Sequence, residues 1–327
     1  MNFPRILKKR KGYIDRIKPF MQKSVIKVLT GQRRVGKSFL LYQLIEEILA
    51  EEPDANIIYV NLEDFTFSSQ QTAEDLHPYI ISHSKEKVKN YIFIDEIQDI
   101  PGFEKVIRSL LLNEDNDIYI TGSNAKMLSG ELATYLSGRY IEFKIYSLSY
   151  SEFLEFHGLT ESETSYELYS RYGGLPYLLN LPLEDETVNE YLKSVYSTIV
   201  FRDVVSRYKL RNTLFLEKLI QFLSENIGNL FSAKNISDYL KSQHTTISVN
   251  QIQSYTEYLN NAFLIHRVER YDLIGKRVFE IGEKYYFENM GIRNIVVGYR
   301  ITDKPIRIRC SGSVFIGVPL FIDIEPA

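Results

Sequence analysis

The chain has 327 residues, of which 44% are hydrophobic and 25% charged, the balance of an ordinary globular protein with room for two or three domains. Its formal net charge is only −3 at pH 7, so nucleic-acid binding would need a local basic patch rather than a bulk positive field. A single cysteine, Cys310, excludes an internal disulfide. No run approaches the roughly 18–20 apolar residues that span a bilayer. These two observations together predict a cytoplasmic protein without a membrane partner.

The first part of the chain alternates predicted strands with predicted helices. It begins with a basic lead-in, 1–24, which is partly helical and lacks the apolar core of a secretion signal. Apolar residues at helical spacing predict helices at 38–51 and 101–112. Buried or alternating runs predict five strands, at 25–30, 56–62, 91–96, 117–124 and 139–145. Strands that alternate with helices predict an α/β fold, in which a parallel sheet carries helices on both faces.

The pattern changes after residue 147. Residues 148–230 are predicted to form a helical lid that is interrupted by a Gly/Pro break at 172–179. Residues 231–296 consist of two short predicted helices followed by two strands that meet at Gly275, which is the order of a winged helix. The predicted domains are therefore 1–147, 148–230 and 231–296, followed by an atypical tail at 297–327.

The stretch GQRRVGKS, residues 31–38, lies between the first predicted strand and the first long helix. It matches the phosphate-binding P-loop, in which glycines let backbone N–H groups curl around phosphate oxygens at a helix N-terminus. Lys37 is predicted to reach the β- and γ-phosphates, and the Ser38 hydroxyl to bind Mg²⁺. A tight glycine turn with an incidental lysine is the alternative, but the position between a strand and a helix favours the P-loop. The predicted nucleotide-binding residues are Gly31, Gln32, Arg33, Arg34, Val35, Gly36, Lys37, Ser38 and Phe39.

Two acids end the predicted strand YIFIDE. Ligand sites of parallel sheets lie at the carboxyl ends of the strands, so Asp95 and Glu96 are expected near the P-loop. We expect Asp95 to support the metal ion and Glu96 to orient and polarise the attacking water. Adjacent acids at a strand end are often merely solvated, and it is the P-loop in the same domain that favours the catalytic interpretation.

Ser123 and Asn124 end another predicted strand, IYITGSN. If this strand lies between the P-loop strand and the Asp95 strand, either side chain can contact the γ-phosphate or the nucleophilic water. Ordinary turn chemistry is the alternative, because Gly-Ser-Asn also favours a turn. The sequence does not choose between Ser123 and Asn124.

These motifs, together with LSGRY and GGLPYLL, resemble the AAA-type ATPases of bacteria and archaea that carry an AAA_14 core and a DUF4143 C-terminal region. The resemblance covers about residues 10–296 and implies an ATPase core, a helical lid and a winged helix. It also implies that Asp95 and Glu96 are the Walker B acids and that Ser123 and Asn124 belong to the sensor segment.

Two further residues are candidates through the same resemblance. Arg139 matches the family's Gly-Arg pair before the last core strand, where a guanidinium can neutralise transition-state charge within the subunit or from a neighbour; a surface ion pair is the alternative. Pro176 resembles a glycine–proline motif that approaches the adenosine in related signalling ATPases, and a simple break between lid helices is the alternative. The side chains of Arg33 and Arg34 are expected to face solvent rather than to act in catalysis.

The C-terminal parts are less typical. The second helix of the predicted winged helix carries Ser248, Asn250, Gln251 and Gln253, which can hydrogen-bond base edges, but it has no lysine or arginine for phosphate contacts. We therefore favour a nucleotide-responsive lid or a protein-docking module over nucleic-acid contact. Family members normally continue into a nuclease-like region, whereas 301–327 has no Asp…Glu-x-Lys arrangement, so we expect a truncated or frame-altered terminus.

The sequence thus predicts Mg²⁺-dependent ATP binding and hydrolysis to ADP and phosphate, coupled to a conformational change of the lid and the winged helix. Turnover is expected to be slow without a partner. Two alternatives stay open, a P-loop kinase acting on a small molecule and a signalling or docking module that uses ATP as a switch with negligible hydrolysis. A protein partner, a nucleic acid and a homo-oligomer also remain open.

Overall fold

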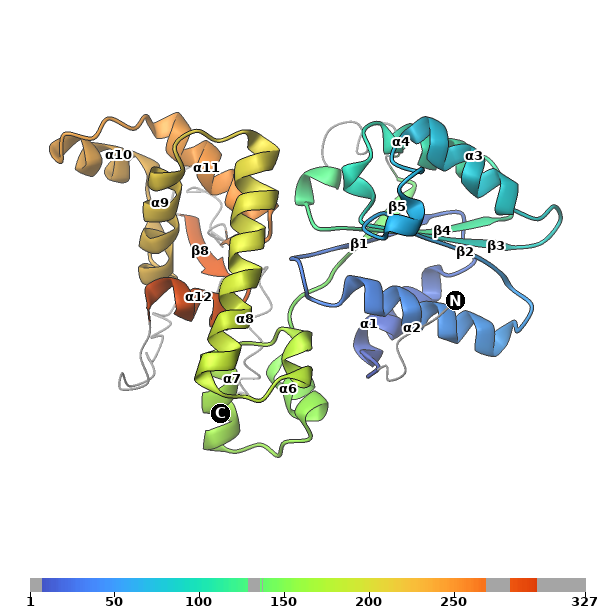
Figure 1. Ribbon diagram of the computed structural model, residues 1–327, viewed down its shortest axis with the longest axis horizontal. Coiled ribbons are helices and arrows are strands. Elements are labelled where there is room, and N and C mark those ends of the chain that lie inside the picture. Colours follow the sequence, from blue (N-terminus) through green and yellow to red (C-terminus); the bar gives the residue numbers. More distant parts are fainter. Residues whose placement is uncertain (1–7, 129–135, 137, 269–282, 299–327) are drawn as a thin grey trace, which may run out of the picture. The chain divides into compact units, whose positions relative to one another are not determined.

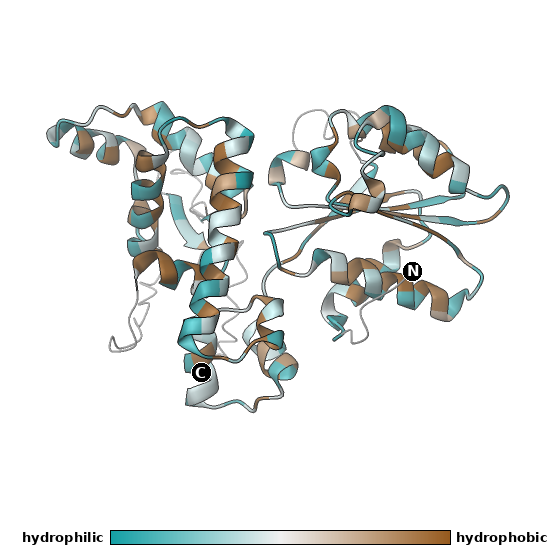
Figure 2. Cartoon of the chain, in the orientation of Figure 1, coloured by the Kyte–Doolittle hydropathy of each residue, from teal (hydrophilic) through white to brown (hydrophobic). Residues whose placement is uncertain are grey.

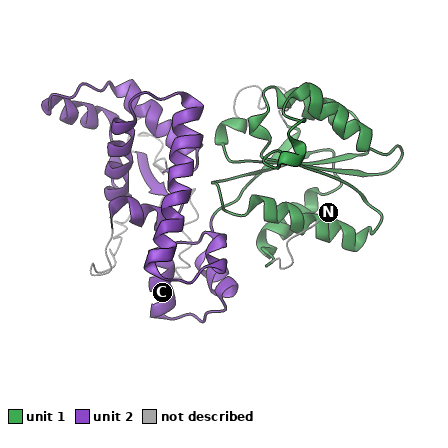
Figure 3. Ribbon diagram, in the orientation of Figure 1, with its two compact units in different colours: residues 1–146 green, residues 147–327 purple. Residues whose placement is uncertain are grey.

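The structure is a computed structural model of the chain, and it describes residues 8–128, 136, 138–268 and 283–298. Cys310, Gly275 and the predicted tail from residue 299 onward lie outside the described residues. The chain divides into two compact units, residues 1–146 and residues 147–327 (Figure 3).

The first unit is built on five parallel strands, as the sequence predicts. Their order across the sheet is β2-β3-β4-β1-β5, so β4 lies between the P-loop strand β1 and the Asp95 strand β3. All residues of β1, β3 and β4 are buried, as expected for central strands that are covered on both faces. The strands are β1 (Ile26–Thr30), β2 (Asn56–Asn61), β3 (Asn90–Asp95), β4 (Asn116–Gly122) and β5 (Tyr140–Lys144).

Helices cover both faces of this sheet, which also agrees with the prediction (Figure 1). On one face lie α1 (Lys11–Ile17) and α2 (Lys37–Glu51), and on the other α3 (Ala73–His83) and α4 (Phe103–Leu110). The helices carry hydrophobic residues on one side and hydrophilic residues on the other (Figure 2). The described residues of this unit also form four short 3₁₀ helices: η1 (Lys18–Phe20), η2 (Phe65–Phe67), η3 (Ile97–Asp99) and η4 (Ala125–Leu128).

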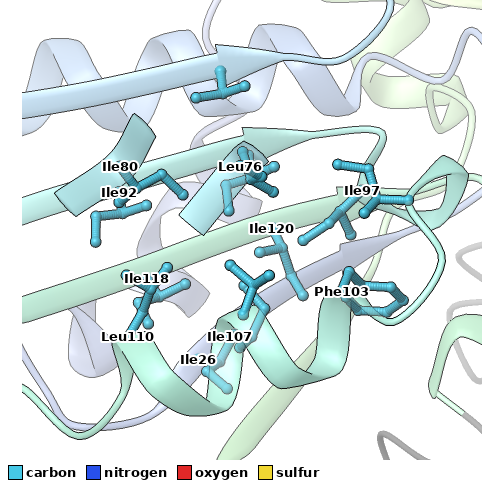
Figure 4. Packing of buried hydrophobic residues seen from close by; sticks show 14 of the residues in the cluster. Ile26, Leu76, Ile80, Ile92, Ile97, Phe103, Ile107, Leu110, Ile118 and Ile120 are labelled. Atoms are coloured by element: carbon cyan, nitrogen blue, oxygen red, sulfur yellow. The ribbon is translucent and has the colours of Figure 1, made fainter. Parts of the chain in front are cut away.

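Branched apolar side chains fill the layer between the sheet and helices α3 and α4 (Figure 4). Ile92 and Ile120 of the strands belong to the same buried cluster as Leu76 of α3 and Ile107 of α4. All four are fully buried, and burial of one such side chain contributes roughly 1.5–3 kcal/mol. This packing fixes the strands, and with them the loops that leave their carboxyl ends.

The second unit is mostly helical. The first helix is capped by a Ser149–Glu152 capping box, and Gly173, with φ +72°, ends the second helix at the predicted Gly/Pro break. A π-helix, η6, continues directly from α8. The elements are α6 (Tyr150–His157), α7 (Glu163–Tyr172), η5 (Pro176–Asn180), α8 (Asp185–Thr198), η6 (Ile199–Ser206) and α9 (Thr213–Glu225).

A small antiparallel sheet with two helices follows. Helices α10 (Ala233–Ser242) and α11 (Val249–Asn261) pack against each other, and the strand order of the sheet is β6-β8-β7. The helices and strands occur in the predicted order, although both strands are shorter in the described residues than the sequence suggests. The strands are β6 (Leu230–Phe231), β7 (Ile265–Val268) and β8 (Glu283–Phe287).

A further helix, α12 (Met290–Val297), contacts α7, α8 and α9. The sequence pattern does not predict this helix. Among the described residues, no helix combines the length and the apolar character that crossing a membrane requires.

Candidate active site

The loop between β1 and α2 has an unusual backbone. Gly31, Arg34 and Gly36 have positive φ angles of 151°, 68° and 94°. Where right-handed and left-handed backbone conformations alternate, successive N–H groups point into one concavity that can bind an anion. A Cβ atom on Gly31 would lie 2.1 Å from the carbonyl oxygen of Ile145, so only glycine fits there. The loop therefore has the conformation that its glycine spacing predicts.

Lys37, the first residue of α2, is buried at this loop. Its Nζ donates to the carbonyl oxygens of Gly31 and Gln32, both at 3.0 Å, and lies 3.5 Å from Glu96 Oε1. A buried ammonium group needs such acceptors to offset its lost hydration. The lysine of the loop and Glu96, the acid that follows β3, thus share a single site.

Asp95 ends β3 and is 1% exposed. Its Oδ1 accepts a hydrogen bond from Thr121 Oγ1 at 2.5 Å and its Oδ2 one from Tyr59 Oη at 3.2 Å. Burial and the Glu96 charge raise the pKa of Asp95, against the lowering effect of hydrogen bonds from Ser38 and Thr121. The two predicted metal ligands, Ser38 and Asp95, are therefore neighbours in this site.

Glu96 follows in a left-handed conformation, with φ 59°, which costs a non-glycine residue about 1–3 kcal/mol. Its N–H donates to Thr121 Oγ1 at 2.9 Å, and its Oε2 accepts from Gln98 Nε2 at 2.6 Å. Although burial acts in the opposite direction, the charges of Lys37 and Arg33 hold the pKa of Glu96 below its usual value. The carboxylate is thus ionised at neutral pH.

Ser123 and Asn124 reach the same edge of the sheet, because Gly122 at the end of β4 pairs with Thr30 at the end of β1. The Ser123 hydroxyl is close enough to Glu96 to help lower its pKa. Asn124 is 2% exposed, and its Oδ1 accepts from the Lys126 N–H at 2.7 Å. Its Nδ2 is buried and has no hydrogen-bond partner within the described part of the chain.

Two family models match this chain. Residues 23–154 match an AAA domain, AAA_14, and residues 163–302 match a domain of unknown function, DUF8612. An uncharacterized protein of Haemophilus influenzae is 37% identical over 301 residues, which make up 88% of this chain and 73% of that protein. The chain belongs to the same family as that protein. An uncharacterized protein of Methanocaldococcus jannaschii is 32% identical over 266 residues, 77% of this chain and 58% of that protein.

Solved structures with a related arrangement are more distant. The Orc1 protein of Aeropyrum pernix, solved in complex with DNA, has 12% identity and a TM-score of 0.38 over 90% of this chain and 94% of that one. AMPPCP-bound DnaA from Aquifex aeolicus has 14% identity and a TM-score of 0.37 over 79% and 90%. Similarity at this level carries no conclusion about the ligands of this chain.

The AAA_14 match agrees with the resemblance that the motifs of the first unit suggest. For the C-terminal part, the family model that matches is DUF8612, and the predicted DUF4143 region is not shown.

Arg139 lies apart from the other candidates of the AAA domain. Its carbonyl oxygen accepts from the N–H of Ile26, the first residue of β1, at 2.9 Å, whereas the P-loop leaves the opposite end of that strand. The five residues of β1, at about 3.3 Å each, separate the two edges. A role of Arg139 within its own subunit is therefore not supported by this geometry, and a role from a neighbour stays a prediction.

The remaining predicted residues have different surroundings. Arg33 is buried and pairs with Glu63 at 3.0 Å, so the expectation that it faces solvent is wrong, while Arg34 is exposed as expected. Phe39 is 48% exposed, with its ring 5.9 Å from that of Tyr42. Pro176 begins η5 in the second unit, and its predicted approach to adenosine stays a prediction.

Sequence reasoning misses three residues that shape this site. Thr121 bridges Asp95 and Glu96, and its position two residues before Ser123 in the predicted strand 117–124 is a usable signal, since alternate residues of a strand share a face. Gln98 contacts Glu96 and follows it by two residues. Arg10 is buried, and its Nη1 donates to the carbonyl oxygens of Val35 at 3.2 Å and of Tyr146 at 2.8 Å. No pattern separates Arg10 from the lysines beside it.

Proposed function

We propose that this protein binds ATP with Mg²⁺ and hydrolyses it to ADP and phosphate, and that hydrolysis changes the conformation of the second unit. The observation that carries the proposal is the convergence of the P-loop with two acids in one buried site. Lys37 lies 3.5 Å from Glu96, and Ser38 is close enough to Asp95 to lower its pKa. Separate, solvated acids at a strand end would not have this arrangement.

The residues present fit a triphosphate. The loop offers converging N–H groups next to the N-terminus of α2, an arrangement that binds phosphate. Lys37 has its charge at the same place, held by carbonyl oxygens that are weaker partners than an anionic phosphate. The buried Asn124 amide is a further donor that the described residues leave without an acceptor.

The residues also fit Mg²⁺. Ser38 and Asp95 supply hydroxyl and carboxylate oxygens, the ligand type that this ion prefers. Within the described ranges no three His, Cys, Asp or Glu side chains gather into a metal site, which agrees with an ion bound mainly together with phosphates. When bound, the ion neutralises charge on the phosphate oxygens.

Each side chain then has a separate task. Lys37 binds the β- and γ-phosphates, and Asn124 donates to the γ-phosphate or to the water. Glu96, an ionised carboxylate beside them, orients and polarises that water. Ser123 is already engaged with Glu96, so we assign the contact with phosphate or water to Asn124 rather than to Ser123.

In the second unit we propose a helical lid followed by a winged helix. The order α9, β6, α10, α11, β7, β8, with β8 between β6 and β7, supports this interpretation. The exposed side chains of α11 include Asn250, Gln253 and Glu257, and this mixture of amides and an acid supports a docking or lid role more than phosphate contact.

Two substitutions test the proposed function. Lys37→Ala is expected to lower ATP affinity by more than tenfold, because the triphosphate loses its buried cation. Glu96→Gln is expected to keep ATP affinity and lower kcat at least 100-fold, because the neutral amide no longer polarises water. Equilibrium dialysis with labelled ATP and phosphate release measure the two effects separately.

The exposed variants Lys105→Ala and Glu74→Gln, on α4 and α3, are the matched controls and are expected to behave as wild type. Equal turnover by wild type and Glu96→Gln would contradict the mechanism. A phosphorylated acceptor in place of free phosphate would instead indicate a kinase.

A nucleotide switch with negligible turnover is the second candidate. It is favoured by the ion pair between Glu96 and Lys37, which engages the carboxylate that should orient water. Single-turnover measurements with excess protein separate the two, since a switch retains ATP intact for many minutes whereas an ATPase converts it to ADP.

A further inference from the structure

Gln98 connects the two strands that carry the candidate catalytic groups. Its Nε2 donates to Glu96 Oε2 at 2.6 Å and lies 3.4 Å from Ser123 Oγ, while its Oε1 accepts from the Ser123 N–H at 3.3 Å. One amide thus bonds both the acid after β3 and the backbone after β4. Gln98 belongs neither to the P-loop motif nor to the Walker B acids, so the proposed function assigns it no role.

The position of Gln98 is built into the backbone. The left-handed turn at Glu96 starts η3, the short helix that carries Gln98. Gly122 ends β4 next to it, and a Cβ atom there would lie 2.7 Å from Gln98 Oε1 and 2.6 Å from Met127 Sδ. A glycine at the end of β4 therefore leaves the space that the Gln98 amide fills.

The chemistry of this position suits an amide. Glu96 needs a donor, and the Ser123 N–H needs an acceptor, and a glutamine offers both at the end of one side chain. A glutamate of the same shape would keep the acceptor but place a second negative charge against Glu96. A hydrophobic residue would leave both neighbours unsatisfied.

The surroundings of Glu96 change when Lys37 takes a new partner. In this structure Glu96 is held by Lys37 on one side and by Gln98 and Ser123 on the other. A triphosphate on the P-loop draws Lys37 away, since one ammonium group cannot serve the phosphates and the carboxylate equally well. The contacts that remain for Glu96 are then those with Gln98 and Ser123.

We propose that Gln98 is a positioning residue that couples the segment after β4 to Glu96. A contact of the γ-phosphate with Asn124 moves the adjacent Ser123, and Gln98 transmits this movement to the Glu96 carboxylate. Glu96 is thereby aligned for water only when the triphosphate is complete. This inference rests on the proposed ATPase function.

Substitutions at both ends of the connection test it. Gln98→Glu keeps the shape of the side chain and is expected to lower kcat about 10- to 100-fold, a range typical of a misplaced catalytic group, with ATP affinity within about threefold of wild type. Gln98→Ala and Ser123→Ala are expected to lower kcat in the same way. The double variant Gln98→Ala/Ser123→Ala is expected to show less than multiplicative effects, because Ser123→Ala removes the hydroxyl contact with Gln98, and Gln98→Ala removes both that contact and the bond to the Ser123 N–H.

Gln71→Ala is the matched control, since the Gln71 amide donates only to carbonyl oxygens of its own loop, those of Leu62 and Phe67, in the described chain. It is expected to retain wild-type kcat. If Gln98→Ala melts at a lower temperature, the isosteric Gln98→Glu decides the outcome.

Two results distinguish a failure of the Gln98 coupling from a failure of the proposed ATPase function. Wild-type protein that neither binds nor hydrolyses ATP would overturn the proposed function and the coupling together. The coupling alone would be overturned if the wild-type protein hydrolyses ATP and either of two results is found. In the first, Gln98→Glu and Gln98→Ala have a kcat within twofold of wild type. In the second, the effects of the two single substitutions multiply strictly in the double variant.

Discussion

At the scale of single residues, Lys37 is the side chain whose partners decide the state of the site. Two unit charges 3.5 Å apart attract each other by roughly 5 kcal/mol at an effective dielectric constant of about 20, part of which offsets their lost hydration. An exposed ion pair would contribute less than about 1 kcal/mol. Because Lys37 and Glu96 are buried, the exchange of Lys37 from Glu96 to phosphate that we propose would change the electrostatic free energy of the site by more than it would for an exposed pair.

The buried amide of Asn124 leads to a prediction about this residue. Asn124→Ala is expected to lower kcat about 100-fold, the usual effect of losing one donor to a developing charge, while stability falls by less than about 1.5 kcal/mol because only one hydrogen bond is lost. Phosphate release and chemical denaturation are the two measurements.

Asn116 at the other end of β4 is the matched control. Its Nδ2 donates to the Leu110 carbonyl at 2.8 Å and its Oδ1 accepts from Asn90 at 3.3 Å. Asn116→Ala is therefore expected to lose about 1–3 kcal/mol of stability and to keep its turnover per folded molecule. The reverse pattern in the two variants would contradict a sensing role for Asn124.

Residues that a local pattern specifies could be predicted from the sequence, and the others could not. The spacing of Gly31, Gly36 and Lys37 describes one turn of backbone, so the loop conformation follows from neighbours in the chain. Thr121 reaches Asp95 across 26 residues of sequence and Arg10 reaches Val35 across 25. The alternation along the predicted strand places Thr121 on the same face as Ser123, but its contact with Asp95 depends on strand order and that of Arg10 on helix placement, which no local pattern specifies.

At the scale of elements, the strands of the first unit could be predicted to within one or two residues. Continuous apolar runs mark central strands, whose burial leaves little choice of conformation. The prediction for β4 runs to residue 124 although the strand ends at Gly122, because the polar residues that follow turn into the site. α4 begins at Phe103 rather than at Pro101, since Gly102 takes the left-handed conformation before it.

Helix α12 shows why one element could not be predicted. It contains Gly291 and ends in two valines, none of which favours a helix. Asn289 caps it by accepting the Ile292 N–H at 3.0 Å, and Gly298 ends it in a left-handed conformation. Its contacts with α7, α8 and α9 supply the stability that its own sequence lacks.

Gly291 gives a prediction that runs against helix propensity. Alanine is a better helix former than glycine by about 1 kcal/mol, but a Cβ atom at Gly291 would lie 2.0 Å from the carbonyl oxygen of Tyr172. Gly291→Ala is therefore expected to destabilise the second unit by about 1–3 kcal/mol. Differential scanning calorimetry should show a lower Tm for one transition.

Gly12, within α1, is the matched control because a Cβ atom there would have no neighbour within 4 Å among the described residues. Gly12→Ala is expected to raise stability by about 0.5–1 kcal/mol. If both variants raised the Tm, the close packing of α12 against the end of α7 would be disproved.

At the scale of the whole molecule, the P-loop is joined through Arg10 to the end of the first unit. The Arg10 guanidinium bonds Val35 in the loop and Tyr146, the last residue before the second unit. Tyr146 in turn donates its N–H to Tyr13 of α1 at 3.1 Å. If nucleotide binding changes the loop, as the proposed function requires, these hydrogen bonds connect that change to Tyr146, the residue before the second unit.

Arg139 carries a prediction about assembly. It is exposed and lies at the amino edge of the sheet, so it serves a nucleotide only if another subunit brings a P-loop to it. Such a contact joins two different surfaces, as in a ring or filament of subunits. Arg139→Ala is then expected to bind ATP normally and to lose turnover, whereas the exposed variant Arg108→Ala on α4 is expected to retain it.

Mixing two inactive variants distinguishes this arrangement from the alternatives. An active interface needs an intact P-loop from one subunit, which the Arg139→Ala variant supplies, and an intact Arg139 from its neighbour, which the Lys37→Ala variant supplies. When equal amounts of the two variants assemble at random, about a quarter of the interfaces have both. We expect about a quarter of wild-type turnover from the mixture, measured as phosphate release alongside the mass in solution. A mixture that assembles but stays inactive would exclude action from a neighbour, and full turnover by Arg139→Ala alone would leave Arg139 as a surface ion-pair residue.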